Sequence, residues 1–173
     1  VPASERAAIL ERAADLLEAE MPRFLALAIR EAGKTLPNAV GEVREAVDFC
    51  RYYAGEARRV FADPAVTPIG PVVAIAPWNF PLILGIGEAI PALMAGNAVV
   101  LKPASLTPLT TLLGCEIAAE AGLPEGLLSA VTGPGRVGED LVDFVDMLSF
   151  TGSVEVGRRL HVKCAERFLP TTM

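Results

Sequence analysis

The second part of the sequence alternates short β-branched runs with helical stretches, and this order restricts the fold more than any other feature. Four runs are typical of strands, at residues 70–76, 97–102, 127–131 and 146–150. Helical stretches separate and follow them, at residues 82–95, 108–121, about 136–142 and 153–165. Strands that alternate with helices predict a parallel sheet with right-handed crossover connections. The expected fold class is therefore α/β, with a parallel sheet of about four strands.

The first part of the sequence, from residue 4 to about residue 62, has a different pattern. It is rich in Ala, Leu, Glu and Arg, and its apolar residues recur every three or four positions, which predicts three helices. Gly33 stands where a left-handed residue would end the second helix. Three prolines and a glycine at residues 61–71 indicate a linker or turn. We expect a helical segment at 1–64 and a sheet segment at 65–173, integrated into one domain.

Composition narrows the choice of partners and compartment. The formal net charge of −6 argues against a nucleic-acid surface and against binding to an anionic membrane. Prolines, asparagines and Glu88 interrupt the apolar stretch 72–101, so we expect no membrane span. Cys50, Cys115 and Cys164 are odd in number and form no CxxC pair, which argues against a disulfide framework and a metal site. They favour a reducing, cytoplasmic location, and the charged N-terminus does not resemble a signal peptide.

Polar residues follow each predicted strand. In parallel sheets of this kind, ligands bind beyond the carboxyl ends of the strands. The sequence places PWN after the first strand, KPAS after the second, TGPGRVG after the third and TGS after the fourth. Four polar strand ends at one edge of the sheet favour a ligand site there.

Each of these ends also has a simpler interpretation. Gly133, Gly135 and Gly138 match the G-x-G-x-x-G dinucleotide fingerprint, but a loop rich in Gly and Pro can be only a turn. Ser153 begins a helix, where it could hold a phosphate or only cap the helix. Lys102 is either a cation at the mouth of the sheet or a solvated surface charge. The residues taken one at a time leave these alternatives open.

Several motifs together resemble the aldehyde dehydrogenase superfamily. PWNFP, GNAVVLKPAS followed by TP, AGLPEG, VTG and SFTGS with EVGR occur in the order and approximate spacing of that family. The helical stretch REAGKTLPNAVGEVREAVDFCRYYA resembles the glutamate-semialdehyde (pyrroline-5-carboxylate) dehydrogenase branch, which includes the dehydrogenase half of bifunctional proline-utilisation proteins. The resemblance implies a Rossmann-like fold, NAD or NADP as cofactor, a small aldehyde as substrate and a homo-oligomer.

The resemblance also assigns roles to residues. It implies that Asn79, the catalytic residue, donates its amide to the substrate oxygen as negative charge develops there, which is worth about 2.7–4 kcal/mol for one such donor. Without the resemblance, Asn79 could instead stabilise a proline-rich corner. The implied cofactor-binding residues are Ile75, Ala76, Pro77, Trp78, Lys102, Ala104, Ser105, Gly133, Gly135, Phe150, Thr151, Gly152, Ser153 and Val156. Among them Lys102 and Ser105 would face the adenosine ribose, and Ser153 would hold the pyrophosphate.

The sequence departs from the family pattern in two respects. The family nucleophile is a Cys in a Gly-Gln-x-Cys setting and the usual base is a Glu in Glu-Leu-Gly-Gly-Lys, and neither motif is present. We expect Met173 to fall one residue before that Glu motif, and we expect no Cys of this chain to be the nucleophile. The link between Arg59 and Gly70 and the stretch LVDFVDMLSF are shorter than in relatives. The expectation is an inactive N-terminal fragment, or alternatively a non-catalytic nucleotide-binding module or an oligomer-forming remnant.

Overall fold

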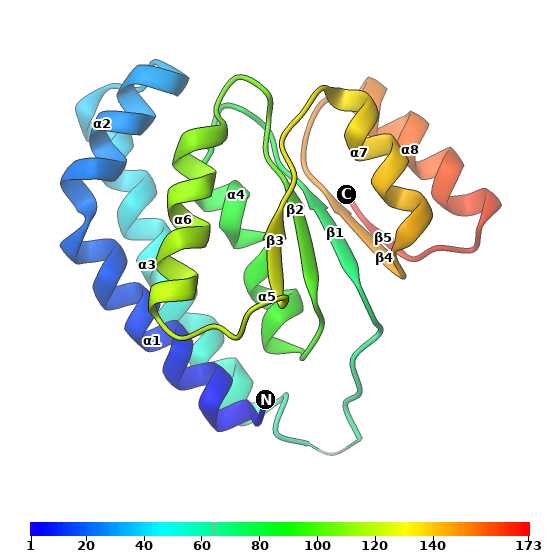
Figure 1. The fold of residues 1–173 in the computed structure, drawn as a ribbon, viewed down its shortest axis with the longest axis horizontal. Coiled ribbons are helices and arrows are strands. Elements are labelled where there is room, and N and C mark those ends of the chain that lie inside the picture. Colours follow the sequence, from blue (N-terminus) through cyan, green and yellow to red (C-terminus); the bar gives the residue numbers. More distant parts are fainter. Residues whose placement is uncertain (64) are drawn as a thin grey trace.

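The computed structural model describes residues 1–63 and 65–173, and within them five parallel strands form one sheet between two layers of helices (Figure 1). The strand order is β3-β2-β1-β4-β5. The strands are β1 (Val72–Ile75), β2 (Val99–Lys102), β3 (Leu128–Ala130), β4 (Met147–Phe150) and β5 (Thr171–Thr172). Every neighbouring pair is parallel, so the predicted α/β fold with a parallel sheet is confirmed.

Strand β5 is the element that the sequence did not predict. It comprises only Thr171 and Thr172, which align with Leu148 and Ser149 of β4. Two residues are too few to show the period-two alternation by which strands are recognised. The other four strands lie inside the predicted runs.

The predicted three-helix segment is confirmed by α1 (Ala3–Ala19), α2 (Met21–Ala32) and α3 (Leu36–Arg59). Gly33 ends α2 in the left-handed conformation, with φ of 64°, as the sequence indicated. The Thr35 side chain caps α3 by accepting a hydrogen bond from the Asn38 N–H at 3.4 Å. A left-handed glycine and a threonine cap therefore turn the chain sharply between α2 and α3.

The prediction of a single helix at 82–95 is wrong in detail. The structure has two helices there, α4 (Ile83–Gly87) and α5 (Ala89–Met94). Pro91 explains the division, since its ring clashes with the carbonyl four residues earlier, which belongs to Gly87. The remaining helices are α6 (Pro108–Glu120), α7 (Gly135–Leu141) with a short 3-10 turn after it, and α8 (Val154–Glu166). None of the described helices combines the length and apolar character needed to cross a bilayer.

The two faces of the sheet bury separate hydrophobic cores. Val72 and Ala74 of β1 pack with residues of α1, α3, α4, α5 and α6. Val73 and Ile75, which point to the other face, pack with Leu160 and Cys164 of α8. The first core combines residues of the helical segment with residues of the sheet segment. The expected boundary at 64 falls on a residue outside the described ranges and stays a prediction.

Two helical glycines provide a test of this packing. A Cβ at Gly114 of α6 would lie 2.6 Å from Ile86 Cγ2 of α4, whereas a Cβ at the exposed Gly55 of α3 would meet no atom within 4 Å. Gly114→Ala should lower the free energy of unfolding by about 1–3 kcal/mol through overpacking. Gly55→Ala should raise it by roughly 0.5–1 kcal/mol through helix propensity. Urea unfolding followed by circular dichroism measures both values; two changes of the same sign would contradict the close packing of α4 on α6.

Candidate cofactor and substrate cleft

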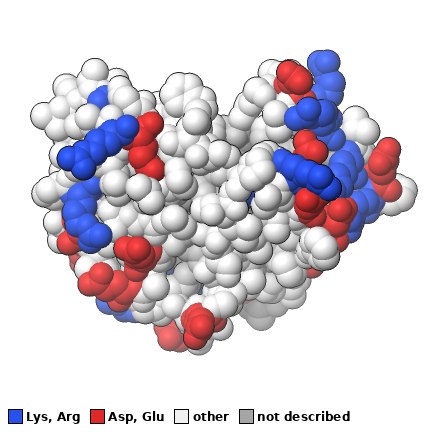
Figure 2. All heavy atoms as spheres, turned by 45° about the horizontal axis from the view of Figure 1, so that its top comes forward, with Lys and Arg blue, Asp and Glu red and all other residues white. Residues whose placement is uncertain are grey.

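A cleft of about 720 Å³ opens at the carboxyl ends of β1, β2 and β4. Strand β1 has β2 and β3 on one side and β4 and β5 on the other, so the connections change direction there. Open α/β sheets bind ligands at such a switch point. Figure 2, which turns this edge of the sheet toward the viewer, shows a hollow with little charge between two groups of charged side chains.

The cleft brings together the predicted site residues with the exception of Gly133. Asn79 and thirteen predicted cofactor-binding residues line it: Ile75, Ala76, Pro77, Trp78, Lys102, Ala104, Ser105, Gly135, Phe150, Thr151, Gly152, Ser153 and Val156. Gly133 lies just behind this lining, because its carbonyl oxygen accepts a hydrogen bond of 2.7 Å from Ser105 Oγ. The loops after β2 and β3 are thereby joined at the cleft.

Two of the three fingerprint glycines have distinct structural roles. Gly133 has φ of 149°, which favours glycine, and it forms the turn between β3 and α7. Gly138 lets α7 approach β1, since a Cβ there would lie 3.0 Å from Ile75 Cδ1. Gly138 therefore allows the close packing of helix on strand that the third glycine of a dinucleotide fingerprint provides, whereas a Cβ at Gly135 would meet no atom within 4 Å.

Lys102 is buried in the cleft wall at the end of β2, and is 4% exposed. Burial lowers the pKa of its ammonium group. No carboxylate of the described residues lies within ion-pair distance of it. The alternative of a solvated surface charge is therefore wrong. A buried cation with no anionic partner suits the oxygen atoms of a ligand.

Asn79 lies on the corner that follows β1, and its side chain is exposed to the cleft. The hydrogen bonds that hold this corner involve backbone groups of Pro81, Leu82 and Ile83, and none among the described residues involves the Asn79 side chain. The amide is therefore free to donate to a ligand. The alternative in which Asn79 closes a structural turn has no support in this geometry.

Ser153 is the N-cap of α8, and its Oγ accepts a hydrogen bond of 3.4 Å from the Val156 N–H. The capping interpretation is correct. It leaves the hydroxyl hydrogen free to donate, and the N-terminal end of the helix dipole faces the cleft. The Thr151 N–H donates to the Ile75 carbonyl at 3.1 Å, which fixes the end of β4 beside the end of β1.

Comparison with known proteins identifies the family to which this chain belongs. The family model described as "Aldehyde dehydrogenase family" matches residues 1–173. The chain belongs to the aldehyde dehydrogenase family. It is 52% identical over 168 residues to the Bifunctional protein PutA of Rhizobium meliloti, covering 96% of this chain and 14% of that protein.

Two further matches include a semialdehyde dehydrogenase and a second proline-utilisation protein. The putative succinate-semialdehyde dehydrogenase [NADP(+)] of Mycolicibacterium smegmatis is 41% identical over 183 residues, covering 97% of this chain and 35% of that protein. The crystal structure of the D779W mutant of Bradyrhizobium japonicum Proline Utilization A superimposes with a TM-score of 0.94 at 43% identity, covering 99% of this chain and 19% of that chain. The chain thus spans about a third or less of each of these three relatives.

The three cysteines of the chain have raised thiol pKa values and lie outside the cleft lining. Burial raises the thiol pKa of Cys50 to about 12 and that of Cys115 to about 11, and it also raises the pKa of Cys164. Thiols with such pKa values carry almost no thiolate at neutral pH. None of the three is among the described residues that line the cleft. The expectation that the nucleophile is not one of these cysteines stays a prediction.

Five cleft residues were not predicted: Phe80, Leu84, Leu106, Glu139 and Leu160. Phe80 directly follows Asn79, and Leu84 lies in α4, one turn further along. Both would have been found if the PWN motif had been extended by one helical turn. Glu139 directly follows Gly138 in α7. Among the described residues that line the cleft, the charged ones are Glu139 and Lys102. Its charge gave no sequence signal, because acidic residues are common on exposed helices.

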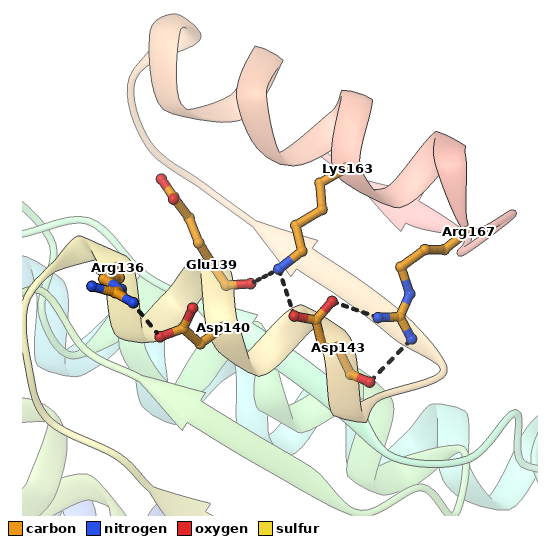
Figure 3. Close-up of polar contacts among 6 residues, drawn as sticks. All are labelled: Arg136, Glu139, Asp140, Asp143, Lys163 and Arg167. Atoms are coloured by element: carbon orange, nitrogen blue, oxygen red, sulfur yellow. Dashed lines mark hydrogen bonds and ion pairs between the residues drawn. The ribbon is translucent and has the colours of Figure 1, made fainter.

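The two helices that form the outer wall of the cleft are joined by a cluster of charged groups (Figure 3). Lys163 of α8 donates to the backbone carbonyl of Glu139 and lies 2.9 Å from Asp143 Oδ2. Arg167 pairs with the same carboxylate and donates to the Asp143 carbonyl at 3.0 Å. The cluster therefore fixes α7, which carries Glu139, against α8, which carries Val156.

This cluster predicts a pH dependence of stability. The hydrogen bond from Lys163, followed by that from Arg167, lowers the pKa of Asp143 below its usual value. The ionised carboxylate therefore stabilises the fold above the ordinary aspartate pKa of about 3.9, and this contribution is lost as the pH falls through the lowered value. Asp143→Asn should lower Tm at neutral pH, and the difference from the parent should disappear in acid.

Asp140→Asn is the matched control, because Asp140 lies near the end of α7, three residues before Asp143 in the following 3-10 turn, and pairs with Arg136 at 3.7 Å in a more exposed position. Its Tm should follow that of the parent at every pH, since exposed pairs contribute little. Thermal unfolding over a pH series measures both variants. A constant difference between Asp143→Asn and the parent down to strong acid would exclude this role for the carboxylate.

Proposed function

We propose that this chain forms the cofactor-binding part of an NAD(P)-dependent aldehyde dehydrogenase, which oxidises an aldehyde to a carboxylic acid through a thioester. The observation that carries the proposal is the cleft at the switch point. Among the described residues, neither the Asn79 amide nor the buried Lys102 ammonium group there has a side-chain partner. Both come from strand ends that the chain folds side by side, since Ile75 and Lys102 are aligned across β1 and β2. Family membership supplies the reaction class.

The residues of the cleft fit a dinucleotide. The buried ammonium of Lys102 and the hydroxyl of Ser105 suit the ribose oxygens, and the Ser153 hydroxyl with the first N–H groups of α8 suits the pyrophosphate. Apolar lining residues such as Trp78, Val156 and Leu160 suit flat rings. The nicotinamide cofactor would supply hydride acceptance, and the residues named here would bind and orient it.

The Asn79 amide is assigned to the substrate. It would donate a hydrogen bond to the substrate carbonyl oxygen, and the bond would strengthen as negative charge develops on that oxygen during attack by a thiolate. An amide suits this position because it is a neutral donor, whereas a carboxylate would repel the developing charge. The thiolate and the base would come from outside these 173 residues, so we expect the chain alone to be inactive.

The names of the relatives favour a semialdehyde as substrate, since one of them is a putative succinate-semialdehyde dehydrogenase. We extend this class to the present protein as part of the proposal. Assembly as a homo-oligomer and a reducing, cytoplasmic location are also proposals; the three free cysteines support the second of these.

The first test concerns Asn79. In the complete protein that carries this chain, Asn79→Ala should lower kcat about 100- to 1000-fold, which is the loss expected for one oxyanion donor. Asn79→Asp, which has nearly the same shape, should be at least as slow because its charge has the wrong sign. The Kd for the cofactor and the Tm should stay close to the parent values. A variant that keeps its rate at saturating substrate would show that Asn79 does not bind the substrate oxygen.

The second test concerns the choice between NAD and NADP. Ser105 carries no charge, so it would not repel a 2′-phosphate, and we propose that both cofactors bind. Ser105→Glu should weaken NADP selectively, because like charges about 4–5 Å apart cost roughly 3–4 kcal/mol at an effective dielectric constant near 20. That cost corresponds to a loss of about a hundredfold or more in affinity.

The neutral Ser105→Gln is the control for the size of the new side chain, and it should affect both cofactors alike. Dissociation constants for NAD and NADP, measured by fluorescence titration of the complete protein, give the selectivity of each variant. Equal losses for both cofactors with Glu, or no loss, would mean that position 105 does not face the ribose.

A further inference from the structure

A buried carboxylate from the helical segment holds the corner that carries Asn79. Glu42 of α3 is 2% exposed, and its Oε1 accepts hydrogen bonds from the Leu82 N–H at 2.7 Å and the Ile83 N–H at 3.2 Å. These N–H groups stand where α4 begins, so they have no partner within the helix. Hydrogen bonds from N–H groups to an ionised carboxylate are about twice as strong as neutral ones.

Lys34 completes the arrangement. Its Nζ lies 2.9 Å from Glu42 Oε2, a contact at ion-pair distance without hydrogen-bond angles, and both side chains are almost fully buried. The same Nζ lies 3.7 Å from the centre of the Phe80 ring. An ammonium group at that distance from an aromatic ring is attracted to it. Lys34 therefore contacts both the carboxylate that holds the corner and the residue next to Asn79.

These contacts surround Asn79 without involving its side chain. The chain before it is held in the sheet, since the Ala76 N–H donates to the Lys102 carbonyl at 3.2 Å. The chain after it is held by Lys34 at Phe80 and by Glu42 at Leu82 and Ile83. The position of the amide is therefore set by its backbone, and the backbone is fixed by side chains that are about 40 residues away in the sequence.

The chemistry of the pair also argues for positioning rather than for stability. A buried ion pair is often no more stable than apolar residues of similar volume. Apolar residues, however, could not accept hydrogen bonds from two backbone N–H groups. A carboxylate on the long, well-packed helix α3, with Val43 and Ala46 buried beside it, provides a rigid acceptor at a fixed place.

We propose that Glu42 and Lys34 are positioning residues that fix the Asn79 amide in the cleft. The proposal rests on the proposed function, because it assumes that this amide contacts the substrate oxygen. A displacement of about 1 Å in an active site can cost 10²-fold in rate. Loss of the Glu42 hydrogen bonds therefore lowers turnover although Glu42 does not line the cleft.

The first experiment reads the corner directly in the 173-residue chain. Trp78 is the single tryptophan, it is adjacent to Asn79, and it is 53% exposed, so its fluorescence reports on the corner. Acrylamide is the appropriate quencher because it is uncharged and insensitive to the removal of a charge. Glu42→Leu should increase quenching of Trp78 and lower its anisotropy. Glu42→Gln, which retains an oxygen acceptor for the two N–H groups, should give a smaller change.

The matched control removes an ion pair elsewhere in the helical segment, which joins α1 to α3. Arg58 Nη1 lies 2.6 Å from Glu11 Oε1, both side chains are about half exposed, and neither contacts the corner through the interactions that hold it. The double variant Glu11→Gln/Arg58→Gln should leave the fluorescence of Trp78 unchanged. A control that alters Trp78 as much as Glu42→Leu would overturn the proposal, because the effect would then reflect general loosening of the helices.

The second experiment measures turnover in the complete protein at a temperature well below the Tm of each variant. Glu42→Leu should lower kcat about 10- to 100-fold, and Glu42→Gln should lower it less. The Kd for the cofactor should stay within a factor of about two to three, because Lys102 at the end of β2, Ser105 after it and Ser153 at the start of α8 are not held by Glu42. Equal losses for Leu and Gln, or an unchanged kcat for both, would overturn the proposal. If Glu42→Leu does not fold, Glu42→Gln still decides, since parental quenching and parental kcat together would exclude it.

Asn79→Ala, measured in parallel, distinguishes failure of the proposed role of the Asn79 amide from failure of the proposed positioning role of Glu42 and Lys34. If this variant keeps the parental kcat, the proposed role of the amide fails and the positioning proposal fails with it. If Asn79→Ala loses rate while the Glu42 variants keep theirs, only the positioning proposal fails. Loss of rate in both, with an unchanged control pair, supports both.

Discussion

The structure depends on the burial of strand β1 on all sides. Its four residues, Val72 to Ile75, are paired to β2 along one edge and to β4 along the other, and both faces are covered by helices. A strand in this position cannot shift its register without moving apolar side chains into the wrong core. Its carboxyl end is therefore a fixed point, and the corner with Asn79, the buried Lys102 and the end of β4 are all located relative to it.

Much of this arrangement could be predicted from the sequence because the signals are local. The β-branched run at 70–76 and the polar corner after it are continuous in the chain, so the strand and the position of the cleft follow from pattern and topology alone. Gly33 at the end of α2 is a similar case, because a position in the left-handed backbone conformation favours glycine whatever residues surround it. The prediction of a single helix at 82–95 was wrong because the apolar period runs through Pro91, whereas the proline ring interrupts the helix there.

Other features could not be predicted because they arise from contacts between distant residues. Glu42 has the ordinary sequence signature of an exposed helical glutamate, and only the packing of α3 against the start of α4 makes it a buried acceptor. Strand β5 exists only because β4 offers an open edge to two threonines. Gly133 was expected in the cleft, but its hydrogen bond with Ser105 places it behind the lining. In each case the partner is remote in the chain and leaves no periodic trace.

The absence of hydrogen bonds to the Asn79 side chain in the described part of the chain has a consequence for how changes at this position would be detected. Because that amide contributes nothing to holding the fold, a substitution there should give a protein that is made, folds and accumulates as well as the parent. Measurements of abundance, solubility or thermal shift would score such a variant as normal. The residues that those measurements do detect, such as Gly114 between α6 and α4, lie in the packed layers away from the cleft. Substitutions that lower stability and substitutions at the Asn79 amide would therefore be detected by different measurements.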